Sequence, residues 1–170
     1  MRNFYWLIEG QLAGCSRPGW DGTPARANGH GAPGGARSDT LAADLAYLRE
    51  RGITALLSLT EAPLPTDALA AAGIATCHVP IGDMTAPTPE QLEEGLAFVD
   101  RQLALGHHVA VHCLVGEGRT GTLLAAYLIR TGHTPAAAIG ELRALRAGAI
   151  TSEEQQRALR AYAARRDWIA

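Results

Sequence analysis

Apolar residues follow two different spacings along the chain, and the spacing separates predicted helices from predicted strands. In 39–51, Leu41, Leu45 and Leu48 share one face of a helix. The run at 53–60, ITALLSLT, is short and almost continuously apolar, which is typical of a buried strand. The same criteria predict further strands at 4–8, 11–14, 74–80 and 108–112, and further helices at 66–72, 88–105, 118–131, 135–146 and 153–168.

The order of these elements predicts the fold class. Strands that alternate with helices favour an α/β fold, with a central mixed or parallel sheet flanked by helices. The first two strands are expected to form a hairpin around Glu9 and Gly10. Thr88, followed by Pro89 and Gln91, has the pattern of a capping box with proline at the first helical position, which marks a helix start.

Length and composition predict one domain with one insertion. A chain of 170 residues with 47% apolar content is long enough for a single core, so we expect one domain over 1–170. The stretch at about 16–38 is rich in glycine, proline and alanine and has no periodicity, which predicts a long loop. Such a loop is either functional or without fixed structure. A functional loop here would fold over a small substrate and bring four of its own residues to it, Arg17, Trp20, Arg26 and Arg37.

Charge and hydropathy exclude several classes of partner and mechanism. The formal net charge is -2 and the basic residues are dispersed, so we expect no nucleic-acid partner. No run of 18 apolar residues occurs, so we expect neither a membrane partner nor a signal peptide, and a cytoplasmic location follows. All 15 basic residues are arginine, which excludes Schiff-base chemistry and the lysine-dependent phosphate loop of nucleotide triphosphatases.

The three cysteines do not form a recognisable framework. Cys15, Cys77 and Cys113 are odd in number and widely spaced, which fits neither a set of disulfides nor a zinc pair. We therefore expect a reduced compartment, no metal and no cofactor. Cys77 lies in a predicted strand and is interpreted as a core residue.

Cys113 stands in a different context, in the stretch VHCLVGEGRTG at 111–121. A predicted strand ends at His112, and a predicted helix begins near Arg119. The loop between them therefore lies where the carboxyl end of a strand meets the amino end of a helix, and α/β folds bind anions there. The loop comprises Cys113, Leu114, Val115, Gly116, Glu117, Gly118 and Arg119.

The residue types in this loop suit phosphate chemistry. Loop N–H groups, the helix dipole and a nearby guanidinium all favour the thiolate of Cys113, which is the nucleophilic form. Gly116 and Gly118 let the backbone wrap around a tetrahedral anion, and the fork of Arg119 matches two phosphate oxygens. The sequence thus predicts a phosphate cradle with a nucleophile at its floor.

The stretch HCLVGEGRTG resembles the signature of cysteine-based protein phosphatases, and is most similar to that of the small dual-specificity phosphatases. The resemblance extends to NFYWLIEGQLAG, LLSLTE, IGDMTAPTPEQ and ITSEEQQRAL, and so covers most of residues 3–167. It fails across the insertion of about 20 residues after Arg17. The resemblance implies a dual-specificity phosphatase fold and a phosphocysteine intermediate.

The resemblance also implies individual roles. Asp83 would be the general acid that protonates the leaving oxygen and then activates water. Thr120 would hydrogen-bond the cysteine sulfur, and His112 would orient the loop through backbone bonds. Gln155 matches the residue near the attacking water, but it is also the third helical position after Ser152, as in a capping box. If Asp83 is not the acid, Glu61 and Glu117 are the alternatives.

The identity of the substrate stays open at this point. Phosphotyrosine, phosphoserine or phosphothreonine in a protein is one class, and a phosphorylated small metabolite such as a nucleotide, nucleoside or sugar phosphate is the other. Lipid-acting relatives carry lysines inside the loop where this chain has Leu114, Val115 and Glu117, which disfavours a polyanionic headgroup. An acidic Glu117 on the rim would repel surplus negative charge and attract a cation.

Two other classes would use the same loop without this reaction. One is a phosphate-binding module without turnover, and the other is an enzyme of sulfur or arsenate chemistry. The second lacks a clear resolving cysteine, because neither Cys15 nor Cys77 lies close to Cys113 in the sequence. The oligomeric state is not predicted.

Overall fold

The computed structural model describes residues 1–22 and 38–166 and contains one five-stranded sheet. Its strands are β1 (Tyr5–Ile8), β2 (Leu12–Cys15), β3 (Ile53–Ser58), β4 (Ala75–His78) and β5 (His108–His112), in the order β1-β2-β5-β3-β4. The first pair is antiparallel and all other pairs are parallel. The fold is therefore the predicted α/β fold with a mixed sheet.

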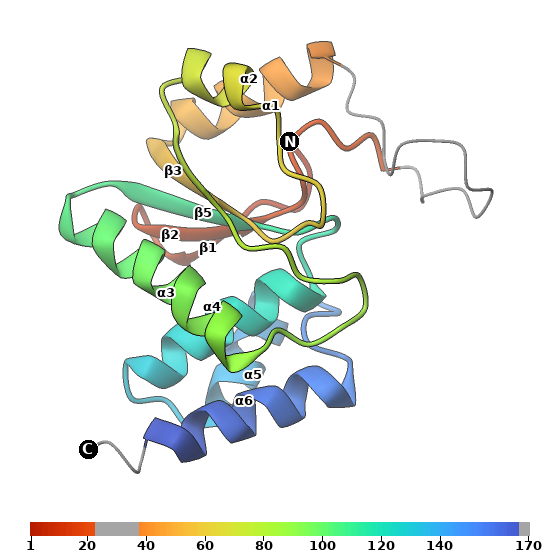
Figure 1. Cartoon of the computed structure of the whole chain (residues 1–170), viewed down its shortest axis with the longest axis vertical. Coiled ribbons are helices and arrows are strands. Elements are labelled where there is room, and N and C mark those ends of the chain that lie inside the picture. Colours follow the sequence, from red (N-terminus) through yellow and green to blue (C-terminus); the bar gives the residue numbers. More distant parts are fainter. Residues whose placement is uncertain (23–37, 167–170) are drawn as a thin grey trace.

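Helices cover both faces of the sheet (Figure 1). On one face lie α1 (Ser38–Glu50) and α2 (Thr66–Ala71), and on the other lie α3 (Pro89–Ala104), α4 (Gly118–Arg130), α5 (Pro135–Leu145) and α6 (Glu153–Arg166). Two clusters of buried side chains fill the spaces between these layers, and the larger one lies under α3 to α6. No helix within the described residues is long and apolar enough to cross a membrane.

Predicted and observed elements agree in type and order, with shifts of one or two residues at their ends. The capping box is present: Thr88 Oγ1 accepts from Gln91 N–H, and Gln91 Oε1 accepts from Thr88 N–H. Residues 167–168, predicted to end the last helix, lie outside the described part of the chain, as do residues 23–37 of the predicted insertion.

The register of the sheet places the site. Cys15 of β2 and Ser58 of β3 are both register partners of His112 at the end of β5. The carboxyl ends of three neighbouring strands therefore lie level with one another. The segments that leave these ends, among them the loop that begins at Cys113, meet at one edge of the sheet, where α/β folds bind their ligands.

Candidate active site

The loop after β5 wraps around the sulfur of Cys113. This side chain is 3% exposed, and the N–H of Gly116 donates to its Sγ at 3.3 Å. Gly116 has a φ of 85°, and a Cβ at this position would lie 2.6 Å from the carbonyl oxygen of Cys15. Only glycine fits both the backbone conformation and this close approach. The predicted cradle is therefore present, with the thiol at its floor.

Arg119, one residue into α4, places a buried guanidinium beside the loop. It is 4% exposed, and its Nη1 donates to the carbonyl oxygen of Ile81 at 2.9 Å. Its Nη2 donates to Asp83 Oδ1 at 2.8 Å, and Nη1 lies 3.5 Å from Glu61 Oε2. Both carboxylates are more than half exposed. The arginine therefore connects the phosphate loop (residues 113–119) to the acid loop (residues 81–87), which carries the predicted acid Asp83.

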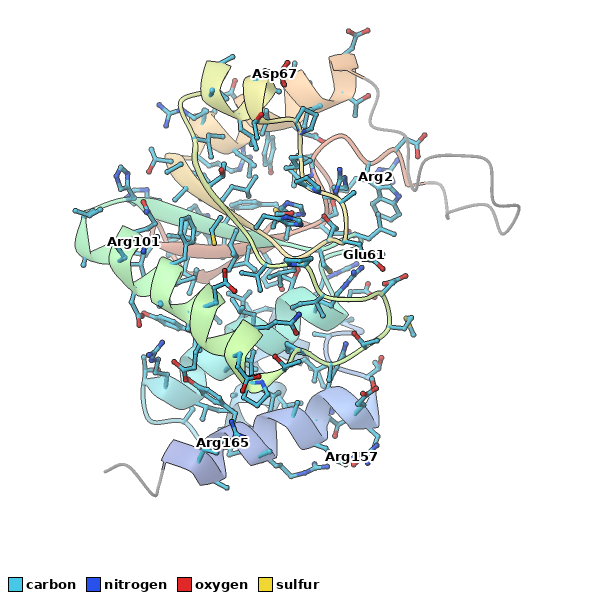
Figure 2. All side chains as sticks on the ribbon, in the orientation of Figure 1. Arg2, Glu61, Asp67, Arg101, Arg157 and Arg165 are labelled. Atoms are coloured by element: carbon cyan, nitrogen blue, oxygen red, sulfur yellow. The ribbon has the colours of Figure 1, made fainter. Side chains whose placement is uncertain are left out.

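Glu61, labelled in Figure 2, lies on the segment that follows β3 and binds the acid loop directly. Its Oε1 accepts from the backbone N–H of Asp83 at 2.9 Å. This hydrogen bond is the main cause that holds the pKa of Glu61 below its ordinary value, and the charge of Arg119 acts in the same direction. Glu61 and Asp83 therefore bind the same guanidinium, and the role of Asp83 as the general acid stays a prediction.

The acid loop is tied at both of its ends. Gln91 Nε2 donates to the carbonyl oxygen of Pro80 at 2.7 Å, while Gln91 Oε1 accepts from the N–H of Thr88 at 2.8 Å. One side-chain amide therefore joins the residue before the loop to the residue after it. Between them, Met84 has a φ of 60° and is 80% exposed. A left-handed methionine is uncommon, and here it turns the chain directly after Asp83.

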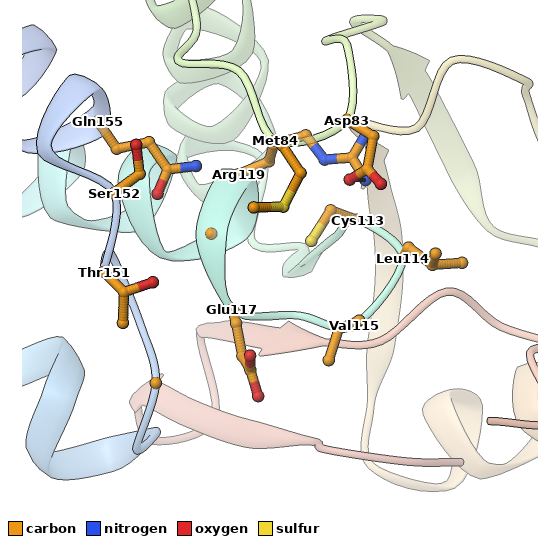
Figure 3. Close-up of a pocket in the computed structure, with 12 residues that line it drawn as sticks. Asp83, Met84, Cys113, Leu114, Val115, Glu117, Arg119, Thr151, Ser152 and Gln155 are labelled. Atoms are coloured by element: carbon orange, nitrogen blue, oxygen red, sulfur yellow. Dashed lines mark hydrogen bonds and ion pairs between the residues drawn. The ribbon is translucent and has the colours of Figure 1, made fainter. Parts of the chain in front are cut away.

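The acid loop, the phosphate loop and residues 148–155 line a cavity of about 250 Å³ (Figure 3). Figure 3 shows Cys113 and Arg119 on one side of it and the segment of Thr151 to Gln155 on the other. Its lining residues are Asp83, Met84, Cys113, Leu114, Val115, Glu117, Gly118, Arg119, Gly148, Thr151, Ser152 and Gln155. The acid loop, the phosphate loop and the segment that contains Thr151 and Gln155 are far apart in the sequence, yet all three meet at this cavity.

His112 is a fully buried neutral side chain. Its Nδ1 lies 3.2 Å from the carbonyl oxygen of Cys113, and because a carbonyl only accepts, Nδ1 carries the hydrogen. Burial lowers the pKa of His112 to about 3. This geometry agrees with the predicted bond between His112 and the loop backbone.

Thr120 differs from its predicted geometry. Its hydroxyl is buried and has no hydrogen-bond partner within residues 1–22 and 38–166, so it makes no bond to the Cys113 sulfur. The sulfur instead accepts from Gly116 N–H. The catalytic role of Thr120 stays a prediction.

Gln155 lies inside the cavity rather than in a capping interaction. It is 4% exposed, and its Nε2 donates to the carbonyl oxygen of Thr85 at 3.4 Å. A Cβ at Gly118 would come within 2.8 Å of the same nitrogen. Gln155 therefore packs between the first turn of α4 and the acid loop, at the wall of the cavity.

The carboxylate of Glu117 is paired, whereas the sequence predicts an acidic rim residue that repels surplus negative charge. Its Oε1 accepts from Arg146 Nη2 at 2.5 Å, and both side chains are about a quarter to a third exposed. Figure 3 shows its side chain directed away from Cys113. Because Arg146 compensates the carboxylate, the expected repulsion of surplus phosphate charge loses its basis.

The first residues of the predicted insertion pack against the domain. Arg17 Nη1 donates to Thr60 Oγ1 at 2.7 Å and to the carbonyl oxygen of Ala62 at 2.8 Å. Its guanidinium is thus committed to the segment after β3 and is not directed over a substrate. The predicted contributions of Arg26 and Arg37 lie outside the described residues.

Several residues of this site have no role that the sequence predicts. Met84 and Thr151 line the cavity, Ser152 is predicted only as a helix start, and Glu61 is predicted only as an alternative acid. For Glu61 a signal existed, because it follows a predicted strand that neighbours the Cys113 strand in a parallel sheet. For Met84 and Thr151 no comparable signal exists.

A fold of this kind with Cys113, Arg119 and an acid loop around one cavity defines a cysteine-based phosphatase. The chain matches the family model of the DSP-PTPase phosphatases of polymorphic toxin systems over residues 29–133. It is 32% identical over 117 residues to human protein tyrosine phosphatase type IVA 3, a match that covers 68% of each protein. The chain thus belongs to the DSP-PTPase phosphatase family and is a cysteine-dependent phosphatase.

Other comparisons agree with this family. The phosphatidylglycerophosphate phosphatase PTPMT1 of Arabidopsis thaliana is 28% identical over 127 residues, which are 70% of this chain and 37% of that protein. The crystal structure of Tk-PTP in the active form superposes with a TM-score of 0.76 at 28% identity, and the match covers 96% of this chain and 97% of that one. A point variant of human DUSP28 has the same fold, with a TM-score of 0.72 at 22% identity over 98% of each chain.

Proposed function

We propose that Cys113, Arg119 and Asp83 carry out phosphate monoester hydrolysis on a phosphorylated protein, with phosphotyrosine as the preferred residue. The observation that carries this proposal is the contact of Gly116 N–H with the Cys113 sulfur at 3.3 Å, within a cavity that Arg119 and Asp83 also line. The Gly116 N–H that donates to the sulfur is available to a phosphate oxygen when sulfur bonds to phosphorus.

In the first step, the thiolate of Cys113 attacks phosphorus and a sulfur–phosphorus bond forms. The bond between phosphorus and the leaving oxygen breaks, and protonated Asp83 gives its proton to that oxygen. The loop N–H groups and the fork of Arg119 stabilise the charge on the three equatorial oxygens. The buried, neutral His112 holds the carbonyl of Cys113 throughout.

In the second step, water attacks the phosphorus of the phosphocysteine. Ionised Asp83 accepts a proton from this water, the sulfur–phosphorus bond breaks, and the electron pair returns to the sulfur. Inorganic phosphate leaves, and the thiolate and the protonated acid are restored. Gln155, which is buried and lines the cavity, would orient the attacking water.

The lining of the cavity supports a monoester of an aromatic alcohol. Met84 supplies an apolar wall for a ring, and among the described lining residues Arg119 is the one cation (Figure 3). A single guanidinium suits one phosphate group, whereas a headgroup with several phosphates requires more. The names of the relatives include both protein phosphatases and a phosphatidylglycerophosphate phosphatase, so lipid monophosphates belong in the test.

The test is a substrate panel with a matched inactive variant. The wild-type chain is assayed on p-nitrophenyl phosphate, phosphotyrosine and phosphoserine peptides, nucleoside monophosphates, sugar phosphates and phosphatidylglycerophosphate. We expect the highest kcat/KM on phosphotyrosine peptides. Preference for a nucleotide or sugar phosphate would support the small-metabolite alternative, and preference for the lipid would support a membrane substrate.

The Cys113→Ser variant tests the covalent mechanism itself. We expect turnover to fall by at least about a thousandfold, because serine is a far weaker nucleophile without a strong base. Tungstate binding, measured by calorimetry, should persist, since the cradle is mainly backbone and Arg119. Wild-type protein that binds tungstate without any turnover would instead support a phosphate-binding module.

A further inference from the structure

Three consecutive carbonyl groups of the phosphate loop bind to the first seventeen residues of the chain. The carbonyl of Leu114 accepts from Arg17 N–H at 3.0 Å, and that of Val115 accepts from Asn3 Nδ2 at 3.0 Å. The carbonyl of Gly116 accepts from the hydroxyl of Tyr5 at 3.4 Å. All three donors therefore come from the β1–β2 hairpin and its flanking residues.

The direction of these carbonyls determines the direction of the loop N–H groups. In a trans peptide unit, the C=O of one residue and the N–H of the next point in opposite directions. When Asn3 holds the carbonyl of Val115 outward, the N–H of Gly116 points inward, and it is found 3.3 Å from the Cys113 sulfur. By the same geometry, the bonds to Leu114 and Gly116 turn the N–H groups that follow them toward the cradle.

The hairpin is shaped to present these donors. The ring of Tyr5 crosses Gly14 of β2 so closely that a Cβ there would lie 2.4 Å from Tyr5 Cζ. Asn3 has a φ of 52°, a left-handed conformation that asparagine tolerates better than most residues. The hydroxyl of Ser16 donates to the carbonyl of Arg2 at 2.8 Å and fixes the segment before β1.

Tyr5 is chemically suited to act as a donor here. Burial raises the pKa of its phenol above the ordinary value, and the nearby Cys113 acts in the same direction. The hydroxyl therefore keeps its hydrogen at any pH at which the enzyme would work. The amide of Asn3 is a neutral donor at every pH.

We infer that Asn3 and Tyr5 are positioning residues of the phosphatase reaction, which hold the Val115 and Gly116 carbonyls outward so that the loop N–H groups face the phosphate oxygens. This inference rests on the proposed function for its effect on turnover. It applies to anion binding independently of turnover, because the N–H groups receive a bound oxyanion in the same way. Neither side chain is among the described residues that line the cavity, so both act through the loop backbone.

The experiment compares variants that remove one donor each. Asn3→Gly keeps the left-handed backbone and deletes the amide, Asn3→Asp keeps the shape and replaces the donor by an acceptor, and Tyr5→Phe deletes the hydroxyl alone. Thr131→Val is the matched control, because Thr131 Oγ1 donates to the carbonyl of Leu128 at 2.9 Å at the far end of α4. The readouts are the dissociation constant of tungstate by calorimetry, kcat and KM for p-nitrophenyl phosphate, and the melting temperature.

Loss of one hydrogen bond should weaken tungstate binding and lower kcat by about fivefold, with a smaller change in KM. Asn3→Asp should lower tungstate affinity and kcat more than Asn3→Gly does, because its carboxylate faces the carbonyl oxygen of Val115. Thr131→Val should match the wild type in both readouts. Tungstate affinity within about twofold of wild type in folded Asn3→Asp and Tyr5→Phe proteins would overturn the inference. If wild type binds tungstate without turnover, the proposed function fails while the tungstate comparison still decides this inference.

Discussion

The carboxylate of Asp83 and the guanidinium of Arg119 are bound to each other at 2.8 Å, Oδ1 to Nη2. The proposed reaction needs both groups on the substrate, since Asp83 as the acid would have to reach the leaving oxygen and Arg119 would have to hold the equatorial oxygens. A bound phosphate dianion attracts the guanidinium more strongly than a half-exposed carboxylate does. In the proposed reaction, substrate binding and release of Asp83 would therefore be coupled through this ion pair.

Replacing Asp83 by asparagine tests its role as the acid. Asp83→Asn should slow alkyl phosphates by about a hundredfold or more, because alkoxides leave poorly without a proton. It should slow p-nitrophenyl phosphate much less, because this phenolate leaves with little protonation. The measurement is kcat/KM against the pKa of the leaving alcohol. Equal slowing across that series would contradict the assignment and direct attention to another carboxyl.

Glu61 provides the matched carboxylate for this experiment. The side chain of Glu61→Gln can still accept from Asp83 N–H but has no charge for Arg119, and the carboxylate of this ion pair is exposed. Because the Glu61 oxygen is solvent-screened and lies 3.5 Å from Nη1, this contact contributes little, and kcat/KM should change by less than about threefold. The dependence on leaving group should be that of the wild type. A steeper dependence in Glu61→Gln than in Asp83→Asn would reverse the two roles.

The pair of Glu117 and Arg146 should appear as a coupling in stability. Both side chains are partly buried, so a double-mutant cycle of Glu117→Gln and Arg146→Met should give a coupling energy of about 1 kcal/mol in the free energy of unfolding. Urea denaturation of the four proteins measures it. Fully additive losses would mean that Arg146 does not compensate Glu117, and the repulsion of surplus charge would return as an explanation.

His112 makes stability depend on pH. Its pKa is about 3 in the native state, and a histidine in an unfolded chain has a pKa of about 6.5. Between these values the unfolded state binds a proton that the native state does not. Stability should therefore fall as pH falls through this window, by up to about 1.4 kcal/mol per pH unit.

The variant His112→Asn isolates this contribution from that of other titrating groups. Its free energy of unfolding, measured by urea denaturation at several pH values between about 4 and 7, should vary less steeply with pH than that of the wild type. The difference between the two slopes, rather than the absolute stability, is the quantity of interest. Parallel curves would show that His112 can be protonated within the native state.

Much of the fold could be predicted from local pattern alone. The helix at Pro89 was predicted because Thr88 and Gln91 carry the capping signal within one helical turn. The phosphate loop was predictable for the same reason, since Cys113, Gly116 and Arg119 lie in one short stretch. Such features depend on chemistry that acts between near neighbours in the sequence.

Contacts between distant segments could not be predicted in this way. Asn3 and Val115 are 112 positions apart, and only the pairing of β2 with β5 brings them together. The pairing of Glu117 with Arg146 depends on where α5 ends, and local rules say nothing about it. Some backbone conformations could not be predicted either, because Met84 and Ile150 adopt positive φ although their side chains disfavour it.

The amide of Gln91, which joins Pro80 to Thr88, has a consequence for the tolerance of the acid loop to changes in length. With both ends fixed, the free energy of closing residues 81–87 depends only weakly on their number, at about 0.6 kcal/mol per doubling. Engineered variants can therefore lengthen this loop at a small cost in closing entropy, provided that Gln91 and the bonds at Ile81, Asp83 and Thr85 stay in place. Without the two hydrogen bonds of the Gln91 amide, the added residues would also loosen the start of α3.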